Sequence, residues 1–379
     1  MADLIFIGKD WELNSRAQQL LINELTLHHR VVWLSYSYLT PDYLLQQLRQ
    51  IVRKNLKDRF GSLNNHNALN PPDNLILQST TLLPVNGLTL VRRLNERTLT
   101  ARLEQLNSQY RFKQPLIFYT QPELPYLSQL TVSTKSIYFH SWHRHKKSSS
   151  LASASNLATK CKLTFSDISD VYAKELSTIV FTSGIDYPSF STPQKHPGNF
   201  KNTQPVAGYF GEFTQRLNIE LLAQAATALP NWQFLFVGRI KCKKGVLEEL
   251  PNVEFLGEKS DSCAAGYLQN WDVSLFPVAT DAIEPDDLIL LQEYMASGTP
   301  VAAVQKDYPD SYHQCICIQG NKEPFSQTLQ RALSDTSRKD IRQEIARLES
   351  YQNKAAQLNK LIHHLTADQP LNSQQESLF

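Results

Sequence analysis

The stretch that decides the fold is VAGYFGEFTQRLNIELLAQAATALPNWQFLFVG, residues 206–238. It opens with the apolar run VAGYF (206–210) and closes with QFLFV (233–237), and each run has the length and composition of a buried strand. The segment NIELLAQAATAL (218–229) lies between them and predicts a helix. Strand, helix and strand at this spacing are typical of a parallel sheet.

The same alternation continues on both sides of this stretch. Downstream, strand-like runs at 253–257, 273–278 and 301–304 alternate with helical segments at 263–270 and 287–296. Upstream, LIFIG (4–8) and VVWLSYS (31–37) flank an amphipathic segment, and further strand and helix patterns follow up to about residue 185. The sequence therefore predicts an α/β protein with two Rossmann-like, doubly wound parallel-sheet domains in tandem.

The domain boundaries follow from composition. Residues 191–204 are polar and rich in turn formers, so they are interpreted as a linker between an N-terminal domain (1–190) and a C-terminal domain (205–338). Residues 339–379 form a helical segment and a tail, which we expect to pack back on the N-terminal domain.

The composition indicates an ordinary soluble protein, with 41% hydrophobic and 20% charged residues among 379. No stretch approaches the roughly 20 apolar residues that a membrane-spanning helix needs, and the first residues predict a strand rather than a signal peptide. The five cysteines are scattered and odd in number, which suits reduced thiols in a cytoplasm. We therefore expect a cytoplasmic protein without disulfides and without a zinc site.

Charge is distributed unevenly along the chain. Residues 1–190 hold 21 Lys and Arg against 14 Asp and Glu, whereas the remainder holds 17 against 22. A basic N-terminal half would suit an anionic partner, such as a lipid-diphosphate acceptor or peripheral contact with the inner face of a membrane. An unevenly charged, solvated surface explains the same counts, so both interpretations stay open. We expect no nucleic acid partner.

Glycines follow three strands of the second domain, at Gly211, Gly238 and Gly257. In open parallel sheets, ligands bind beyond the carboxyl ends of the strands, where glycine lets a ligand approach the backbone closely. Each glycine alone is explained by a turn of the chain, but three in successive units favour a nucleotide site.

Five stretches of the second domain carry a resemblance to a known family. GYFGEF, ALPNWQFLFVGR, LPNVEFLGEKS, YLQNWDVSLFPV and LLQEYMASGTPVAA occur in this order over residues 208–303. Here the chain resembles the donor-binding domain of GT-B glycosyltransferases of family GT4 (group 1), particularly bacterial polysaccharide enzymes. The first domain resembles the family more weakly, through DWELNSRAQQLLINEL (10–25) and residues 163–190. The resemblance implies two domains that face each other across a cleft.

The resemblance also implies roles for particular residues of the C-terminal domain. Glu293 matches the glutamate that accepts hydrogen bonds from the ribose hydroxyls of the donor. Arg216 and Arg239 are the nearest basic candidates for contact with the leaving diphosphate. The remaining donor-binding candidates are Gly211, Gly238, Leu256, Gly257, Glu258, Ser297, Gly298 and Thr299.

Two positions depart from the family. A glutamate common in the family eight residues before the ribose-binding one is Pro285 here, with Glu284 beside it. A related branch has a lysine three residues before the ribose-binding glutamate, and that position is Leu290. Both departures bear on catalysis more than on the fold.

The N-terminal domain supplies the acceptor-side candidates. His140 follows a predicted strand, where the family has a histidine that faces the donor sugar, and an imidazole can hydrogen-bond or polarise a hydroxyl. Asp10, Trp11 and Arg16 would border the same cleft.

The predicted function is glycosyl transfer from a nucleotide-sugar donor to a glycan or lipid-linked acceptor in cell-surface polysaccharide or glycoconjugate synthesis. The resemblance implies a retaining hexosyltransferase that uses no metal and no cofactor besides the donor. Two alternatives stay open: a catalytically impaired relative that acts as a binding or regulatory partner, and a sugar-nucleotide epimerase.

Overall fold

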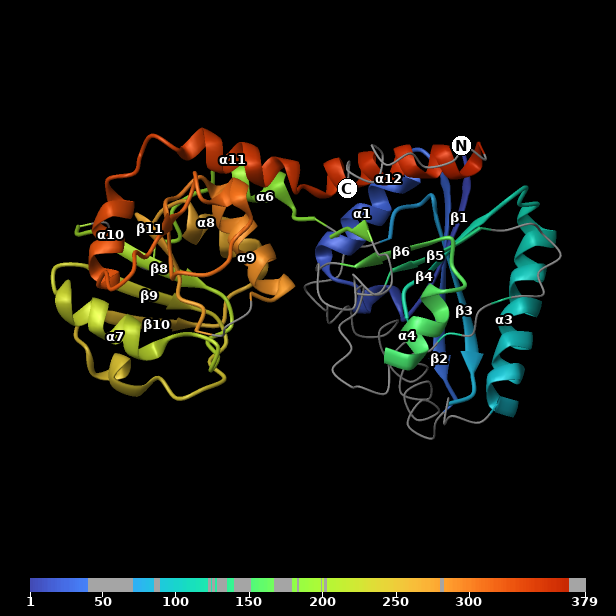
Figure 1. Cartoon of the computed structure of the whole chain (residues 1–379), viewed down its shortest axis with the longest axis horizontal. Helices are drawn as coiled ribbons and strands as arrows, with labels where there is room; N and C mark the ends of the chain where they lie inside the picture. Colours follow the sequence, from blue (N-terminus) through green and yellow to red (C-terminus); the bar gives the residue numbers. More distant parts are fainter. Residues whose placement is uncertain are drawn as a thin grey trace, which may run out of the picture. The chain divides into compact units, whose positions relative to one another are not determined.

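The computed structural model describes residues 1–39, 71–84, 89–121, 124, 127, 135–139, 151–166, 179–182, 184–198, 200, 203–279 and 283–367. The chain divides into two compact units. The first contains residues 1–183 together with the chain from Lys354 onward, and the second is Gly184–Asn353. Figure 1 labels most of the helices and strands of both units.

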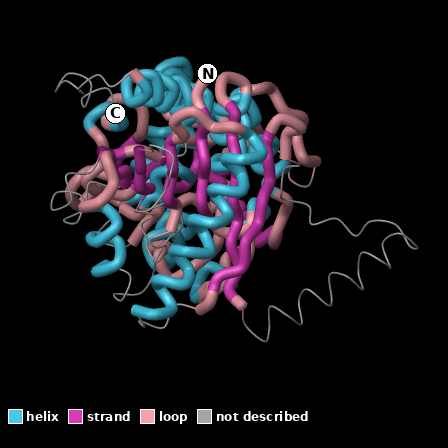
Figure 2. Tube along the Cα trace, turned by 90° about the vertical axis from the view of Figure 1, so that its right-hand side faces the viewer, coloured by secondary structure: helices cyan, strands magenta, loops and turns pink. Residues whose placement is uncertain are grey.

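The first unit is built on a parallel sheet with the strand order β3-β2-β1-β4-β5-β6-β7. Helix α3 covers one side of this sheet and α1 the other (Figure 1), and Figure 2 shows the strands running side by side. The apolar side chains of α3 pack on the strands in one core with Leu34, Ile117 and Tyr138. The strands are β1 (Asp3–Gly8), β2 (Arg30–Tyr38), β3 (Leu75–Leu82), β4 (Leu116–Tyr119), β5 (Lys135–Phe139), β6 (Leu163–Ser166) and β7 (Ile179–Val180), and the helices are α1 (Arg16–Thr26), α3 (Thr89–Tyr110), α4 (Leu151–Ala158) and α12 (Tyr351–Thr366).

The second unit has a six-stranded parallel sheet with the order β10-β9-β8-β11-β12-β13. One core lies between this sheet and α7 and α10, and another between the sheet and α6, α8, α9 and α11. The strands are β8 (Val206–Phe210), β9 (Gln233–Val237), β10 (Val253–Gly257), β11 (Val273–Phe276), β12 (Val301–Ala303) and β13 (Cys317–Ile318), and the helices are α6 (Tyr187–Ser191), α7 (Ile219–Ala228), α8 (Ala264–Leu268), α9 (Pro285–Ser297), α10 (Phe325–Leu333) and α11 (Lys339–Leu348).

The observed division differs from the predicted boundaries at two places. The chain enters the second unit at Gly184, before the predicted linker, because Ile185 forms a β-bridge with Ser350 of the same unit. The C-terminal segment is two helices instead of one, and the first of them, α11, packs on α9 in the second unit. Only α12 is grouped with the first unit, where His29 and Asn359 share a hydrogen bond of 2.8 Å.

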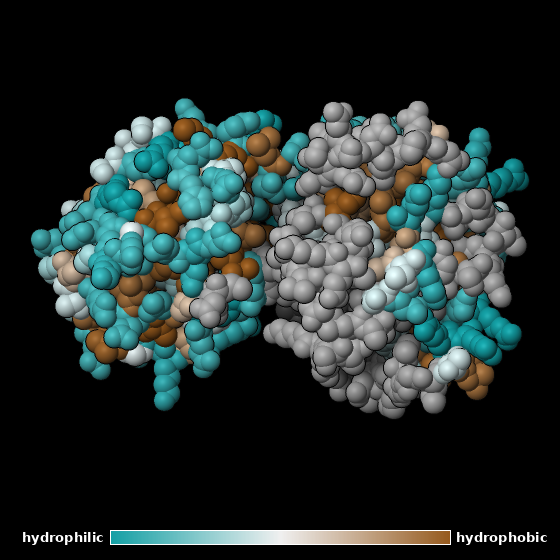
Figure 3. Space-filling view, in the orientation of Figure 1, coloured by the Kyte–Doolittle hydropathy of each residue, from teal (hydrophilic) through white to brown (hydrophobic). Residues whose placement is uncertain are grey.

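The surface of the second unit is mostly hydrophilic on the face seen in Figure 3, with apolar residues scattered between polar ones. Its large exposed apolar side chains are few, and two of the four lie on α11, which is ordinary for a protein surface. They are Ile240, Val246, Ile341 and Leu348. Among the described residues, no helix has both the length and the apolar character that crossing a bilayer requires.

Candidate functional site

The order of the second sheet creates a switch point between β8 and β11. The chain moves outward in one direction through β9 and β10, and in the other direction through β12 and β13. The loops that follow β8 and β11 are joined there: Leu217 pairs with Val278, and the Ala279 N–H donates to the Arg216 carbonyl. Ligands of doubly wound sheets bind in the crevice at such a point, beyond the carboxyl ends of the strands.

The three glycines predicted as a set lie side by side at this edge. The Gly211 N–H donates to the Val237 carbonyl and the Gly238 N–H to the Gly257 carbonyl, each at 2.9 Å. A Cβ atom at Gly238 would lie 1.9 Å from the Gly211 carbonyl oxygen, so the close approach of two loops explains this glycine. Gly257 has a φ of +72° and faces open space, which leaves its backbone accessible to a ligand.

Glu293 lies on α9 and keeps part of its surface accessible to solvent. Burial in its surroundings raises the pKa of the carboxyl group to about 8, with smaller contributions from the charges of Asp261 and Asp186. Near neutral pH, much of the free protein therefore carries a proton on Glu293. A carboxyl group held in this way can exchange its proton for hydrogen bonds from a diol, because the ionised form has only acceptor sites.

The neighbours of Glu293 hold α9 in place. The Tyr294 hydroxyl accepts from the Phe210 N–H at 2.9 Å and donates to the Phe210 carbonyl at 3.0 Å, which fastens α9 to the end of β8. On the other side of Glu293 in the sequence, the side-chain amide of Gln292 donates to the Tyr312 hydroxyl at 2.8 Å. Sequence reasoning missed Tyr294; the one available signal was that a buried tyrosine needs a hydrogen-bond partner for its hydroxyl.

Arg216 lies at the N-terminus of α9, where it forms ion pairs with Glu284 and Asp287. Both carboxylates also cap the helix: Glu284 is the N-cap residue, and the side chain of Asp287 accepts from the Glu284 N–H at 2.7 Å. The Nε of Arg216 is buried and has no hydrogen-bond partner within the described part of the chain. A cation therefore lies at the switch point, but a phosphate there would have to compete with two carboxylates, and the predicted contact of Arg216 with the diphosphate stays a prediction.

Arg239 pairs with Glu258, and both side chains are more than half exposed. Hydrogen bonding to Arg239 lowers the pKa of Glu258, and the same bond raises the pKa of Arg239. Leu256, which precedes this turn, is half-buried. This ion pair links the loop after β9 to the loop after β10, and the backbones of both loops lie at the edge of the sheet.

The predicted donor-binding role of Ser297, Gly298 and Thr299 finds no support in their side chains. Ser297 donates to the Tyr294 carbonyl at 2.7 Å, and the hydroxyl of buried Thr299 donates to the Leu268 carbonyl. Gly298 ends α9 in the left-handed conformation, and a Cβ atom there would lie 2.9 Å from the Lys339 side chain. These residues build the C-terminus of α9, as its cap geometry requires.

The acceptor-side residues of the first unit separate into accessible and buried ones. Asp10 and Arg16 are exposed beyond β1. Trp11 is only 5% exposed and packs edge-on against Trp33 with the ring centroids 5.5 Å apart, so it belongs to the core instead of lining a site. His140 lies outside the described residues and stays a prediction.

Gln121 is a residue that the sequence did not single out. It follows β4 at the switch point of the first sheet and is fully buried. Neither polar atom of its amide has a hydrogen-bond partner among the described residues. Leaving a buried amide unpaired is costly, so such a group marks a place where a ligand hydroxyl would be accommodated.

No cluster of three or more His, Cys, Asp or Glu side chains suited to a metal ion occurs in the described parts of the chain. The candidate donor site consists of the sheet edge with its three glycines, the partly buried carboxyl of Glu293 on α9, and Arg216 at the N-terminus of that helix.

Comparison with known proteins places these residues in a family context. Residues 204–335 match the family described as "Glycosyl transferases group 1". The chain is 25% identical over 192 residues to the "Putative teichuronic acid biosynthesis glycosyltransferase TuaH" of Bacillus subtilis (strain 168). That match covers 45% of this chain and 46% of the Bacillus protein, so it spans about half the length of each.

Solved structures with low sequence identity have the same fold over nearly the whole chain. Sucrose-phosphate synthase from Thermosynechococcus elongatus has a TM-score of 0.62 at 14% identity and covers 97% of this chain and 100% of its own. HepE from Anabaena, solved in complex with UDP, has a TM-score of 0.60 at 14% identity over 95% of this chain and 99% of its own. The two units therefore have the GT-B fold, and residues 204–335 are similar to the group 1 glycosyl transferases.

Proposed function

We propose that this chain is a glycosyltransferase that moves a sugar from a nucleotide-diphosphate donor to a glycan or lipid-linked acceptor. The observation that carries the proposal is Glu293, a partly buried carboxyl with a pKa of about 8 within residues 204–335. A ribose diol donating to this group would stabilise its ionised form and recover part of the cost of its burial.

The donor would lie along the carboxyl edge of the second sheet. Its diphosphate would be placed near Arg216 and the glycine-bearing turns, and its base near the accessible backbone of Gly257. In the reaction the bond between the sugar C1 and the diphosphate oxygen breaks, and a bond from C1 to an acceptor oxygen forms as that oxygen loses its proton. Arg216 would offset the charge of the leaving diphosphate once Glu284 and Asp287 release it.

The finer features of the proposal come from the resemblance and the neighbours. A retaining outcome and a hexosyl donor are part of it, as is a reaction that needs no cofactor besides the nucleotide-sugar. UDP is the first nucleotide to test, because HepE was solved with it. A cell-surface polysaccharide acceptor follows the Bacillus relative's name, and contact with an anionic membrane remains a proposal from the charge of residues 1–190.

Turnover is the direct test of the proposal. The full chain is incubated in turn with UDP-, GDP-, TDP- and ADP-sugars, and release of the nucleoside diphosphate is measured with and without lipid-linked glycan acceptors. We expect release with one donor class and its loss in Glu293→Ala. Binding without turnover would favour a non-catalytic relative, and interconversion of the free donor sugar would indicate an epimerase.

A further inference from the structure

The second unit has a pocket beside β13, an edge strand of its sheet. It occupies about 540 Å³ and is lined by β13, by residues that precede this strand, and by residues from the last turn of α10 to the start of α11. The donor-site glycines follow β8, β9 and β10, whereas this pocket lies beside β13, at the other edge of the sheet from β10. Its lining residues are His313, Ile316, Cys317, Ile318, Arg331, Ser334, Asp335, Ser337 and Arg338.

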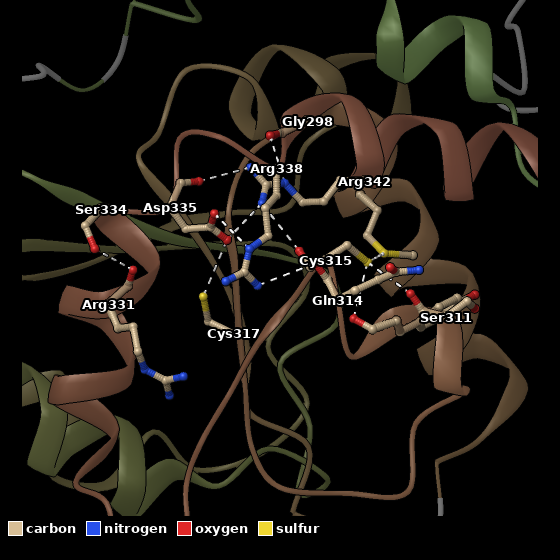
Figure 4. Close-up of polar contacts among 12 residues, drawn as sticks. Gly298, Ser311, Gln314, Cys315, Cys317, Arg331, Ser334, Asp335, Arg338 and Arg342 are labelled. Atoms are coloured by element: carbon tan, nitrogen blue, oxygen red, sulfur yellow. Dashed lines mark hydrogen bonds and ion pairs between the residues drawn. The ribbon is translucent and has the colours of Figure 1, made fainter.

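The pocket contains two accessible guanidinium groups. The side chain of Arg331 is 50% exposed and that of Arg338 is 42% exposed. Arg331 uses Nη2 to contact Glu323 and the Ile318 carbonyl, while its Nε and Nη1 have no partner among the residues that the structure describes. Figure 4 shows its guanidinium lying apart from the hydrogen-bonded cluster around Asp335.

Arg338 is also weakly engaged by the protein. Its Nε lies 3.4 Å from an Asp335 oxygen and its Nη1 lies 3.5 Å from the Gln314 carbonyl, distances at the long limit of hydrogen bonding. Arg338 is the N-cap residue of α11. An arginine side chain has no hydrogen-bond acceptor, so it does not cap the first backbone N–H groups of this helix.

Asp335 is the acidic group of the pocket, and its charge is already offset. The guanidinium of Arg342, only 1% exposed, contacts an Asp335 oxygen at 3.2 Å and the Asp335 carbonyl at 3.3 Å (Figure 4). Because buried Arg342 already balances the charge of Asp335, the positive charge of Arg338 is not neutralised by that carboxylate. Arg331 lines the same pocket with its Nε and Nη1 donors unused by the described residues, and Ser334 and Ser337 line it as well.

We propose that this pocket is a second ligand site, specific for a phosphate-bearing small molecule. Two guanidinium groups with free donors bind a tetrahedral oxyanion well, because each presents planar, charge-assisted N–H groups to its oxygens. Ile316 and Ile318 are apolar lining residues, and the volume is within the range of ligand sites, which leaves room for an organic group attached to the phosphate.

The site has a route to the donor half of the unit. Arg342, which balances Asp335, donates from Nε to the Gly298 carbonyl at 3.1 Å, and Gly298 ends the helix that carries Glu293. Occupation of the pocket would draw Arg338 away from Asp335. Arg342 would then be the remaining arginine that balances the charge of the Asp335 carboxylate. The proposal concerns binding and does not depend on glycosyl transfer.

Calorimetric titration of the full chain with inorganic phosphate, at constant ionic strength set with chloride, tests the site. We expect binding that weakens on the order of tenfold or more in the double variant Arg331→Gln/Arg338→Gln, since both charge-assisted contacts are lost. Arg347→Gln serves as the matched control, because Arg347 is an exposed arginine of α11 outside the pocket.

A second variant separates this pocket from the donor site. Arg216→Gln removes the cation of the proposed donor site, and we expect it to leave this phosphate affinity unchanged. Thermal melting in phosphate-free buffer checks that the double variant folds. Absence of phosphate binding, or binding that Arg216→Gln abolishes while the double variant retains it, would overturn the proposal.

Discussion

At the residue scale, the candidate donor site depends on a carboxyl group whose surroundings favour its neutral form. Burial is the main cause of the raised pKa of Glu293, and Asp261 and Asp186 add to it. An ionised Glu293 without a hydrogen-bonding partner is therefore unfavourable, and a ribose diol supplies such a partner. The free energy of nucleotide binding should then depend on pH.

Nucleotide affinity is expected to rise with pH up to about 8. Below the Glu293 pKa the group must lose its proton before it accepts from ribose, so each unit of pH decrease costs up to about tenfold in affinity. Above that pKa the dependence levels off. Titration calorimetry between pH 6 and 9 measures it, and Glu293→Gln should give a flatter profile while Glu258→Gln, altered at an exposed carboxylate, should keep the slope. A wild-type profile as flat as that of Glu293→Gln would contradict this role.

Gln121 illustrates the second residue-scale point, a buried polar group with no partner among the described residues. Replacing it by methionine, Gln121→Met, removes that unsatisfied amide while preserving much of the side-chain volume. We expect the free energy of unfolding to rise by about 1–2 kcal/mol. Denaturant unfolding measures the change. A loss of stability would mean that the amide is hydrogen-bonded after all.

At the element scale, helix boundaries and helix partners were harder to predict than strands. The strands around residues 206–237 follow directly from short apolar runs, and the observed β8 and β9 agree with them. The segment from Lys339 carries helix formers throughout, so its periodicity gives no sign of the break between Leu348 and Tyr351. That break comes from tertiary structure, because Ser350 bridges to Ile185.

The contacts of Arg342 fix helix α11 in the second unit, so replacing Arg342 should lower the free energy of unfolding. Arg342 is almost fully buried and contacts Asp335 as well as the Gly298 and Cys315 carbonyls. Arg342→Met leaves buried Asp335 with weaker compensation and should lower the free energy of unfolding by about 3 kcal/mol. Arg347→Met on the exposed face of the same helix should change it by less than about 0.5 kcal/mol. Equal effects of the two variants in denaturant unfolding would argue against this arrangement.

Helix α12 contributes a pH-sensitive contact. His29 accepts from the Ala2 N–H at Nδ1 and contacts the Asn359 side chain through Nε2, an arrangement that requires a neutral ring. Burial is the main cause of the lowered pKa of His29, and His363, the N-terminal amine and His28 lower it further. The hydrogen bond with Asn359 raises the pKa of His29, but by less than burial lowers it.

The sign of the effect on stability follows from this lowered pKa. In the unfolded chain His29 gains a proton near pH 6.5, before the folded chain does, so the free energy of unfolding falls as pH decreases below that value. Melting temperatures at pH 7.5 and 5.0 measure the loss, which should be smaller in His29→Gln than in the wild type. His28→Gln, at the exposed neighbour, should behave like the wild type. Similar losses in all three proteins would exclude this contribution.

At the scale of the whole molecule, the sequence predicted the fold class well, because two series of alternating strands and helices give two parallel sheets. Gly211, Gly238 and Gly257 could be singled out because they follow predicted strands, and Glu293 because it stands in a stretch that resembles the family. The ion pairs that occupy Arg216 and the burial of Trp11 could not, since they depend on which loops meet in space. The pocket beside β13 combines residues of β13, of α10 and of the loops around them, and it has no sequence signature.

The central claim is that the second unit binds a nucleotide through Glu293. The most direct measurement is calorimetric binding of UDP, GDP, TDP and ADP in turn to the full chain and to Glu293→Ala, at pH 8. We predict that one of these nucleotides binds and that Glu293→Ala weakens its binding by more than about tenfold, as loss of two charge-assisted hydrogen bonds would. Binding of none of them, or equal binding to both proteins, would contradict the claim.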